Sequence, residues 1–425
     1  MRKEGSRFAL GDIDRRAMLA LPLAAAIPAC ARRRGALTIW AMSTEGENLP
    51  VLTHGFKHET GIAVDVEPVP WTAGHEKLLT AFAGGSLPDV MMLSAPWVAE
   101  FAMIGAIAPV PAKARHLLDD QFPGVLAQVR IGGRDRVVPW TIGPQVQFYR
   151  RDLLAEVGHA APPADWAGWK RMGHAIKARH PDRYAALMML NWPEHLFSFA
   201  SQMPDRPLRD RDTRGNFSSA GFREALGFYK SIFDEKLAPA VLSTEIGDQY
   251  VLFAQGWFAI LPGAPYTVGD LRRRAAMIPE ARWATAPIPG PGGLAPGVIG
   301  VNSLAVSSTS RDPVRAWALI AYLCRPDVQE RFHALIGDLP SRPSAWTRPG
   351  LANDTTVAAF RTQVERLSPQ PAIPEWQHVM DEVQLVAERM VRGQLTVAAA
   401  AAEMDRRADL ILAKRRWLID KGRIA

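Results

Sequence analysis

Short apolar runs alternate with longer stretches of helical spacing along the first part of the chain. Residues 37–42 and 89–93 are apolar runs of strand length, and residues 62–67 alternate apolar and polar positions. Residues 49–60, 71–83 and 97–104 carry apolar residues at helical spacing. This order predicts an α/β layered unit, in which the wholly apolar run 89–93 is a strand buried on both faces, as in a parallel sheet.

The stretch 137–169 predicts a passage into a second layered unit. Val146 and Phe148 alternate with polar positions as in a half-buried strand, and residues 151–157 have helical spacing. Gly158 and the Pro162-Pro163 pair end that helix. Asp165 is placed to cap the next helix, which carries Trp166 and Trp169.

Two amphipathic helices are predicted near the C-terminus, over 376–391 and 397–414 with Gly393 between them. Cys324 follows the helical pattern 316–323, where a small buried thiol is expected.

The N-terminus has the pattern of an export signal over residues 1–29. The pair Arg15-Arg16 precedes an apolar run, 20–29, that is too short to cross a bilayer, and the pair resembles a twin-arginine signal. Residues 27–30 resemble the cleavage box of a bacterial lipoprotein, which predicts lipidation of Cys30. Pro28 departs from that box and leaves ordinary cleavage nearby open. A periplasmic or extracytoplasmic location follows.

Composition describes an ordinary globular protein with a surplus of tryptophan. Of the 425 residues, 48% are apolar, 22% are charged and 13 are tryptophan. The length without the predicted signal, at roughly 150 residues per domain, suggests two or three domains and favours two large ones. The net charge of +7 is spread along the chain as single residues and short arginine clusters. This distribution argues against a nucleic-acid groove, which would gather basic and aromatic residues on one face.

Motifs for catalysis and for phosphate binding are missing from the sequence. There is no Walker loop, no GxGxxG after a strand, no HExxH and no GxSxG. His54 and His58 are four residues apart and could share a metal, but a solvent-facing pair is favoured. We therefore expect no catalytic residue, no metal and no cofactor.

Seven fragments in order resemble the carbohydrate-binding branch of the extracellular solute-binding proteins of bacterial ABC importers, the branch that includes maltose-binding protein. They lie at residues 56–62, 83–90, 139–166, 252–263, 286–293, 303–306 and 312–323, and the likeness covers nearly the whole chain from residue 37.

The resemblance implies two α/β lobes joined by hinge strands, with a helical C-terminal segment. The N-terminal lobe is expected at 36–144 plus 300–340 and the C-terminal lobe at 145–299 plus 341–425. The first crossing between them is expected near 142–145. The implied function is capture of a sugar or oligosaccharide and its delivery to the membrane permease of an ABC importer, by a protein that acts as a monomer.

A sugar site needs aromatic platforms and planar polar groups, which in α/β lobes converge at strand ends and the loops after them. Tyr266 also lies where the family often places a stacking aromatic. The predicted ligand-binding residues are Trp40, Ser43, Glu45, Ser94, Trp97, Trp140, Asn191, Trp192, Gly263, Tyr266, Asn302 and Arg342.

Three of these residues have an equally simple structural explanation. Trp97 can begin a core-facing helix, Glu45 can be a solvated loop residue, and Arg342 can be a surface charge. Receptors for a glycerol phosphodiester or a polyamine remain open as alternatives within the same fold. A secreted two-lobed enzyme is less favoured, because no nucleophile or acid–base pair is visible.

Overall fold

A computed structural model describes residues 35–368 and 370–423. The predicted export signal and Cys30 lie outside the described residues. Within them, no helix is long and apolar enough to cross a membrane.

The first lobe is built on a six-stranded sheet in the order β12-β4-β11-β3-β1-β2. Its strands are β1 (Leu37–Met42), β2 (Val64–Val69), β3 (Val90–Ser94), β4 (Val138–Pro144), β11 (Ile299–Val306) and β12 (Leu339–Pro340). The predicted strands are confirmed, and residues 90–93 of β3 are fully buried. The sheet is mixed, because β1 is parallel to β2 and β3 whereas β11 is antiparallel to β3 and β4.

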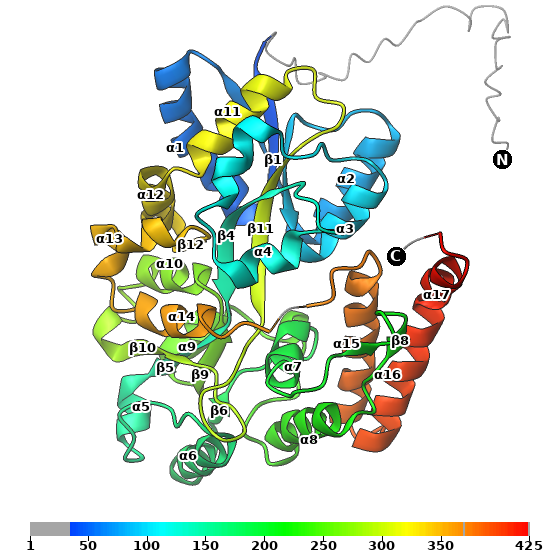
Figure 1. Ribbon diagram of the computed structural model, residues 1–425. Coiled ribbons are helices and arrows are strands. Elements are labelled where there is room, and N and C mark those ends of the chain that lie inside the picture. The colour runs from blue at the N-terminus through cyan, green and yellow to red at the C-terminus, as the bar shows by residue number, and fades with distance from the viewer. Residues whose placement is uncertain (1–34, 369, 424–425) are drawn as a thin grey trace, which may run out of the picture. The chain divides into compact units, whose positions relative to one another are not determined.

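Helices cover both faces of this sheet, with α1 and α11 on one side and α2 and α3 on the other (Figure 1). The helices of this lobe are α1 (Ser43–Thr60), α2 (Trp71–Ala83), α3 (Ala95–Met103), α4 (Pro123–Val129), α11 (Pro313–Leu323), α12 (Pro326–Ile336) and α13 (Pro349–Ala352). The prediction that the first helix begins at residue 49 was wrong, since α1 follows β1 directly at Ser43. Ser43 and Glu45 are therefore in the first turn of a helix.

The second lobe is built on a four-stranded sheet in the order β10-β5-β9-β6. Its strands are β5 (Val146–Arg150), β6 (Tyr184–Ala186), β9 (Phe258–Gly263) and β10 (Trp283–Pro287), with a small ribbon of β7 (Leu208–Arg209) and β8 (Arg214–Gly215). The predicted cap is confirmed, because the Gly168 amide donates to Asp165 Oδ1 at 2.7 Å.

The helices of the second lobe include the C-terminal pair that the sequence predicts. They are α5 (Arg151–Ala155), α6 (Trp166–Arg179), α7 (Pro193–Ala200), α8 (Ala220–Asp234), α9 (Gln249–Gln255), α10 (Tyr266–Arg273), α14 (Val357–Val364), α15 (Trp376–Val391), α16 (Val397–Ile411) and α17 (Ala413–Asp420). The helix predicted over 397–414 is interrupted at Leu412, where α16 ends.

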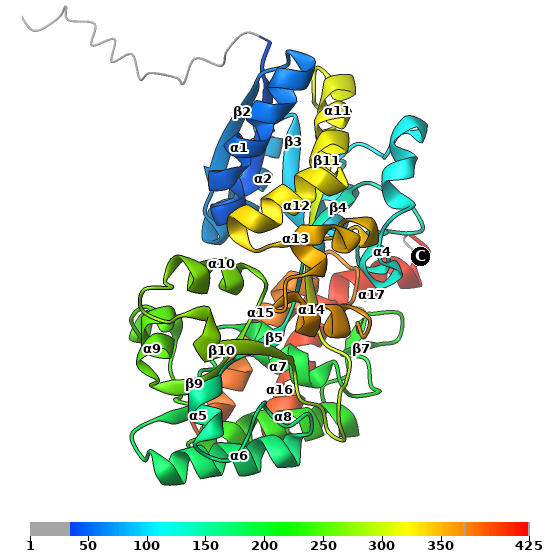
Figure 2. The same ribbon diagram turned by 90° about the vertical axis from the view of Figure 1, so that its left-hand side faces the viewer.

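Three segments connect the sheets, at Gln145, between β10 and β11, and before α14. The last connection lies later in the chain than predicted, because residues 341–352 pack on the first sheet. Ser341 Oγ donates to the Pro139 carbonyl at 2.8 Å, and Trp346 Nε1 donates to the Pro340 carbonyl at 2.8 Å. Figure 2 shows α13 beside α12, and α10 packed below α12 at the junction of the lobes.

Candidate ligand-binding site

A row of polar side chains crosses three strands of the first sheet. Asn302 on β11 is paired with Ser94 on β3 and with Thr141 on β4. Its Nδ2 atom donates to Thr141 Oγ1 at 3.2 Å and to Glu45 Oε1 at 3.1 Å. The early start of α1 therefore brings Glu45 to this row, where Asn302 contacts Glu45 and is paired with Ser94.

Two buried carboxyl groups lie at this place, Glu45 at 8% and Asp338 at 7% exposure. Burial raises the pKa of Glu45 well above its usual range, and the nearby Asp338 carboxylate raises it further. Burial also raises the pKa of Asp338 to about 7, against the opposing effect of His333. Among the described residues, no arginine or lysine acts on the pKa of either carboxyl group, so the pair favours ligand groups that donate hydrogen bonds.

The second lobe contributes Tyr266 and Glu194 to the same region. Burial is the largest cause of the raised pKa of Tyr266, followed by the charges of Glu194, Asp270, Asp338 and Glu45. Burial likewise raises the pKa of Glu194. Both side chains are nevertheless accessible to water, with Tyr266 at 36% exposure. Both side chains therefore reach water although many protein atoms surround them, as expected for groups at a ligand site.

Local structure explains how the second lobe presents these groups. Tyr266 begins α10 just after β9, whose last residue is Gly263. A Cβ atom at Gly263 would lie 2.8 Å from Thr267 Oγ1 and 3.4 Å from the Phe148 ring, so the turn into α10 requires glycine. Trp192 is half-buried before α7, and its ring lies 5.8 Å from that of His195.

An aromatic cluster of the first lobe lies beside α2 and α3. Trp97 is 6% exposed, and its ring is 5.7 Å from that of Trp71 and 5.4 Å from that of His75. His75 Nε2 contacts Glu100 Oε2 at 2.7 Å. Trp97 therefore packs mainly in the core, and Trp71, at 36% exposure, is the more accessible ring.

Three other predicted residues lie apart from the carboxyl pair. The ammonium nitrogen of Lys77 on α2 lies over the Trp40 ring, 4.6 Å from the ring centroid. Ser43 Oγ accepts from the Trp71 amide at 3.3 Å. Asn191 is exposed and holds the loop at Ser243 through two hydrogen bonds of 2.8 and 2.9 Å.

Two predictions of site residues are corrected by the structure. Trp140 was expected to face the cleft, but it is fully buried, stacks on Phe332 at 4.7 Å and donates to the Leu323 carbonyl at 3.2 Å. Arg342 was expected to reach ligand hydroxyls, but its Nε atom is paired with Asp120 at 3.0 Å and its Nη1 atom donates to the Cys324 carbonyl at 3.0 Å. Both residues stabilise the first lobe.

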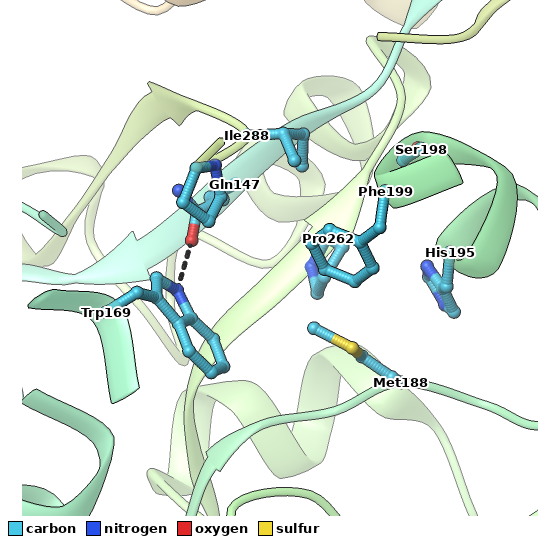
Figure 3. Close-up of a pocket in the computed structure, with 9 residues that line it drawn as sticks. Gln147, Trp169, Met188, His195, Ser198, Phe199, Pro262 and Ile288 are labelled. Carbon is cyan, nitrogen blue, oxygen red and sulfur yellow. Dashed lines mark hydrogen bonds between the residues drawn. The ribbon is translucent and has the colours of Figure 1, made fainter. Parts of the chain in front are cut away.

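A small pocket in the second lobe is lined by residues of β5, β9, α6 and α7. Figure 3 shows Gln147, Trp169 and Met188 around it, with His195 and Ser198 on the α7 side. Its free volume of about 10 Å³ has room for a single water molecule but not for a sugar ring. Burial lowers the pKa of His195 to about 4, so its imidazole is neutral.

Sequence reasoning missed Glu194, Asp338 and Thr141 as members of this region. Glu194 stands two residues after the predicted Trp192, in the first turn of α7. That proximity was the only sequence signal for it. Asp338 and Thr141 join Glu45 only through long-range strand pairing. Among the described residues, no group of His, Cys, Asp and Glu side chains is arranged to hold a metal ion.

Solved structures similar to this protein include the sugar-binding protein MalE from the phytopathogen Xanthomonas citri. It is 43% identical, covers 91% of this chain and 99% of its own, and has a TM-score of 0.85. The GacH receptor of Streptomyces glaucescens, solved unliganded and with acarbose, is 24% identical and shares the fold with a TM-score of 0.81 over 89% of this chain and 98% of its own.

Among known sequences, a lipoprotein of Streptomyces antibioticus encoded in the 5′ region of oleD is 28% identical, over 77% of this chain and 75% of its own. The model of the bacterial extracellular solute-binding proteins matches residues 52–359, which is more than half of the chain. The fold is thus the two-lobed fold of maltose-binding-protein-like receptors, and the chain belongs to the bacterial extracellular solute-binding protein family.

Proposed function

We propose that this solute-binding protein captures a sugar or oligosaccharide between its lobes and delivers it to the permease of an ABC importer. The observation that carries the proposal is the convergence of Glu45, Asp338 and Asn302 from the first lobe with Tyr266 and Glu194 from the second. The likeness to a sugar-binding protein at 43% identity supports the choice of ligand.

Hydroxyl groups of a sugar suit these partners chemically. Carboxylates accept hydrogen bonds from hydroxyls, an asparagine amide both donates and accepts, and aromatic rings cover the apolar faces of the sugar. Because the groups come from both lobes, a bound sugar stabilises the closed form over the open form.

A glycerol phosphodiester fits this region poorly, because carboxylates repel a phosphate and no arginine is among the groups named above. Polyamines would be attracted by the carboxylates, so they belong in the binding screen. The proposal is of a receptor rather than an enzyme, and it predicts that sugar recovered from the complex is chemically unchanged.

The test is a thermal-shift and calorimetric screen of the protein without residues 1–34 against mono-, di- and oligosaccharides, phosphodiesters and polyamines. A specific ligand at a hundred times its Kd should stabilise the fold by about 2.7 kcal/mol. A response to polyamines or phosphodiesters with none to any sugar contradicts the proposed ligand class.

Substitution of the two accessible second-lobe aromatics tests the location of the site. Trp192→Ala and Tyr266→Ala should each weaken sugar binding by about tenfold or more, which corresponds to about 1.4 kcal/mol. Trp417→Ala is the matched control, because Trp417 is exposed on α17 away from these groups. If both site variants bind sugar as the parent does, the cleft assignment is wrong.

The sequence suggests further properties that we include in the proposal: export by the twin-arginine route, a lipid anchor on Cys30 and action as a monomer. Mass spectrometry of the mature chain tests the anchor. A lipid-modified N-terminal Cys30 supports it, and a free N-terminus elsewhere contradicts it.

A further inference from the structure

A stripe of exposed apolar and basic side chains runs along the outside of α16 and α17. Leu410, Lys414, Trp417 and Lys421 follow at i, i+4, i+7 and i+11, which places them on one helical face. Leu412 separates the two helices with φ −82° and ψ 0°. Lys414 and Trp417 therefore share one face of α17 with Lys421 just after it, and Leu410 precedes them at the end of α16. Figure 1 shows α17 following α16 at the outer side of the second lobe.

The apolar members of this stripe are unusually accessible. Leu410 is 65% exposed and Trp417 is 53% exposed, whereas Leu412 and Ile419 on the opposite side are 0% and 6% exposed. The inward residues thus account for the packing of the helices. Leu410 and Trp417 are the apolar side chains of this segment that packing within the chain leaves most exposed to water.

The charge of the segment is strongly positive. Residues 410–423 contain five basic side chains and one acidic side chain, a net charge of +4. Arg416 donates to the Thr213 carbonyl at 3.0 Å, and Arg415 lies 4.0 Å from Glu375. Within the described residues, Lys414 and Lys421 have no such partner, so both ammonium groups are available to an outside anion.

We infer that this stripe, Leu410, Lys414, Trp417 and Lys421, docks the protein on an anionic phospholipid surface. Tryptophan favours the boundary between lipid headgroups and acyl chains, and lysines beside it are attracted to anionic headgroups. Apolar and basic side chains that follow one another along a helix are typical of segments that lie on a lipid surface. Docking there would hold the receptor close to the permease that it serves.

Vesicle co-sedimentation tests the inference with the chain that starts at Gly35, which contains both sheets and both cores. We expect binding to vesicles of equal parts phosphatidylglycerol and phosphatidylcholine at low salt, weaker binding at high salt, and little binding to phosphatidylcholine alone. The triple variant K414E/W417A/K421E should bind the anionic vesicles about tenfold or more weakly.

A matched triple variant serves as the control. K113E/R115E/V314A makes the same changes in charge and removes an apolar residue that is 79% exposed on the first lobe. It should bind the anionic vesicles as the parent chain does, and both variants should keep the parent's melting temperature and sugar affinity. No binding of the parent to anionic vesicles, or equal losses in the two variants, would overturn the inference.

Discussion

At the scale of single residues, the site depends on carboxyl groups that the fold buries close together. Glu45 and Asp338 are far apart in the sequence, and each is less than a tenth exposed. Burial disfavours the charged form of both groups, and the Asp338 carboxylate adds to this effect for Glu45, which explains their raised pKa values. The ligand-free protein therefore buries two carboxyl groups whose ionisation is unfavourable, as binding sites often do.

This arrangement predicts a pH-dependent stability. An aspartate in an unfolded chain has a pKa of about 3.9, whereas the pKa of Asp338 in the folded chain is about 7. Between these values the folded state retains a proton that the unfolded state has lost, so the free energy of unfolding falls as the pH rises from about 4 to about 7. Urea unfolding of Asp338→Asn at several pH values should show a shallower fall.

Asp119→Asn is the control for this experiment, because Asp119 is an exposed aspartate of the first lobe. It should unfold with the pH profile of the parent. If the free energy of unfolding of Asp338→Asn depends on pH as that of the parent does, the pKa of Asp338 is not raised in the folded protein. In Asp338→Asn, the free energy of unfolding should still fall somewhat with rising pH because of Glu45, whose pKa is raised mainly by burial.

At the scale of elements, α6 shows how a local signal fixes a boundary. Asp165 accepts from the Gly168 amide at 2.7 Å, and Trp166 and Trp169 then bury the inner face of the helix. The Trp169 indole also donates to Gln147 Oε1 on β5 at 2.7 Å, which fixes the helix against the strand. Capping therefore sets both the start and the direction of α6.

Removal of this cap should destabilise the protein by about 1 kcal/mol, within the range of about 0.5–2 kcal/mol for N-cap residues. Urea unfolding of Asp165→Ala measures the loss. Asp165→Asn should unfold close to the parent, because an asparagine oxygen can accept the same hydrogen bond. Equal losses in the two variants would mean that the carboxylate charge, rather than the capping bond, stabilises the helix.

At the scale of the whole molecule, connecting strands join the two lobes. A ligand that contacts both lobes should therefore stabilise both of them against unfolding. Cys324 is a fully buried free cysteine of the first lobe, and burial raises the pKa of its thiol to about 12. Its reaction with a thiol reagent therefore requires the lobe to open.

A bound sugar at a hundred times its Kd should slow the labelling of Cys324 about 100-fold, if the lobe opens only by global unfolding. Mass spectrometry of the chain from Gly35, which lacks Cys30, follows the reaction. Tyr266→Ala at the same sugar concentration is the control and should be protected less. Identical labelling rates with and without sugar would show that Cys324 is exposed by local opening.

The sequence by itself determined the α/β class, the buried strand β3, the cap at Asp165 and the two C-terminal amphipathic helices. These features depend on neighbouring residues, whose spacing and capping chemistry are visible in the chain. It also indicated Glu45, Trp192 and Tyr266, because polar and aromatic residues that follow apolar runs are expected near strand ends, and Asn302, because it lies near an expected crossing between the lobes.

Only the tertiary structure decided which of these residues meet. Pairing of β4, β11 and β12 brings Thr141 and Asp338 to Glu45 and Asn302, and the same pairing places Trp140 in the core. The choice between core and cleft for a tryptophan depends on which face of the strand is covered by a helix distant in the sequence. Strand pairing and helix packing join residues hundreds of positions apart, and local patterns do not encode those contacts.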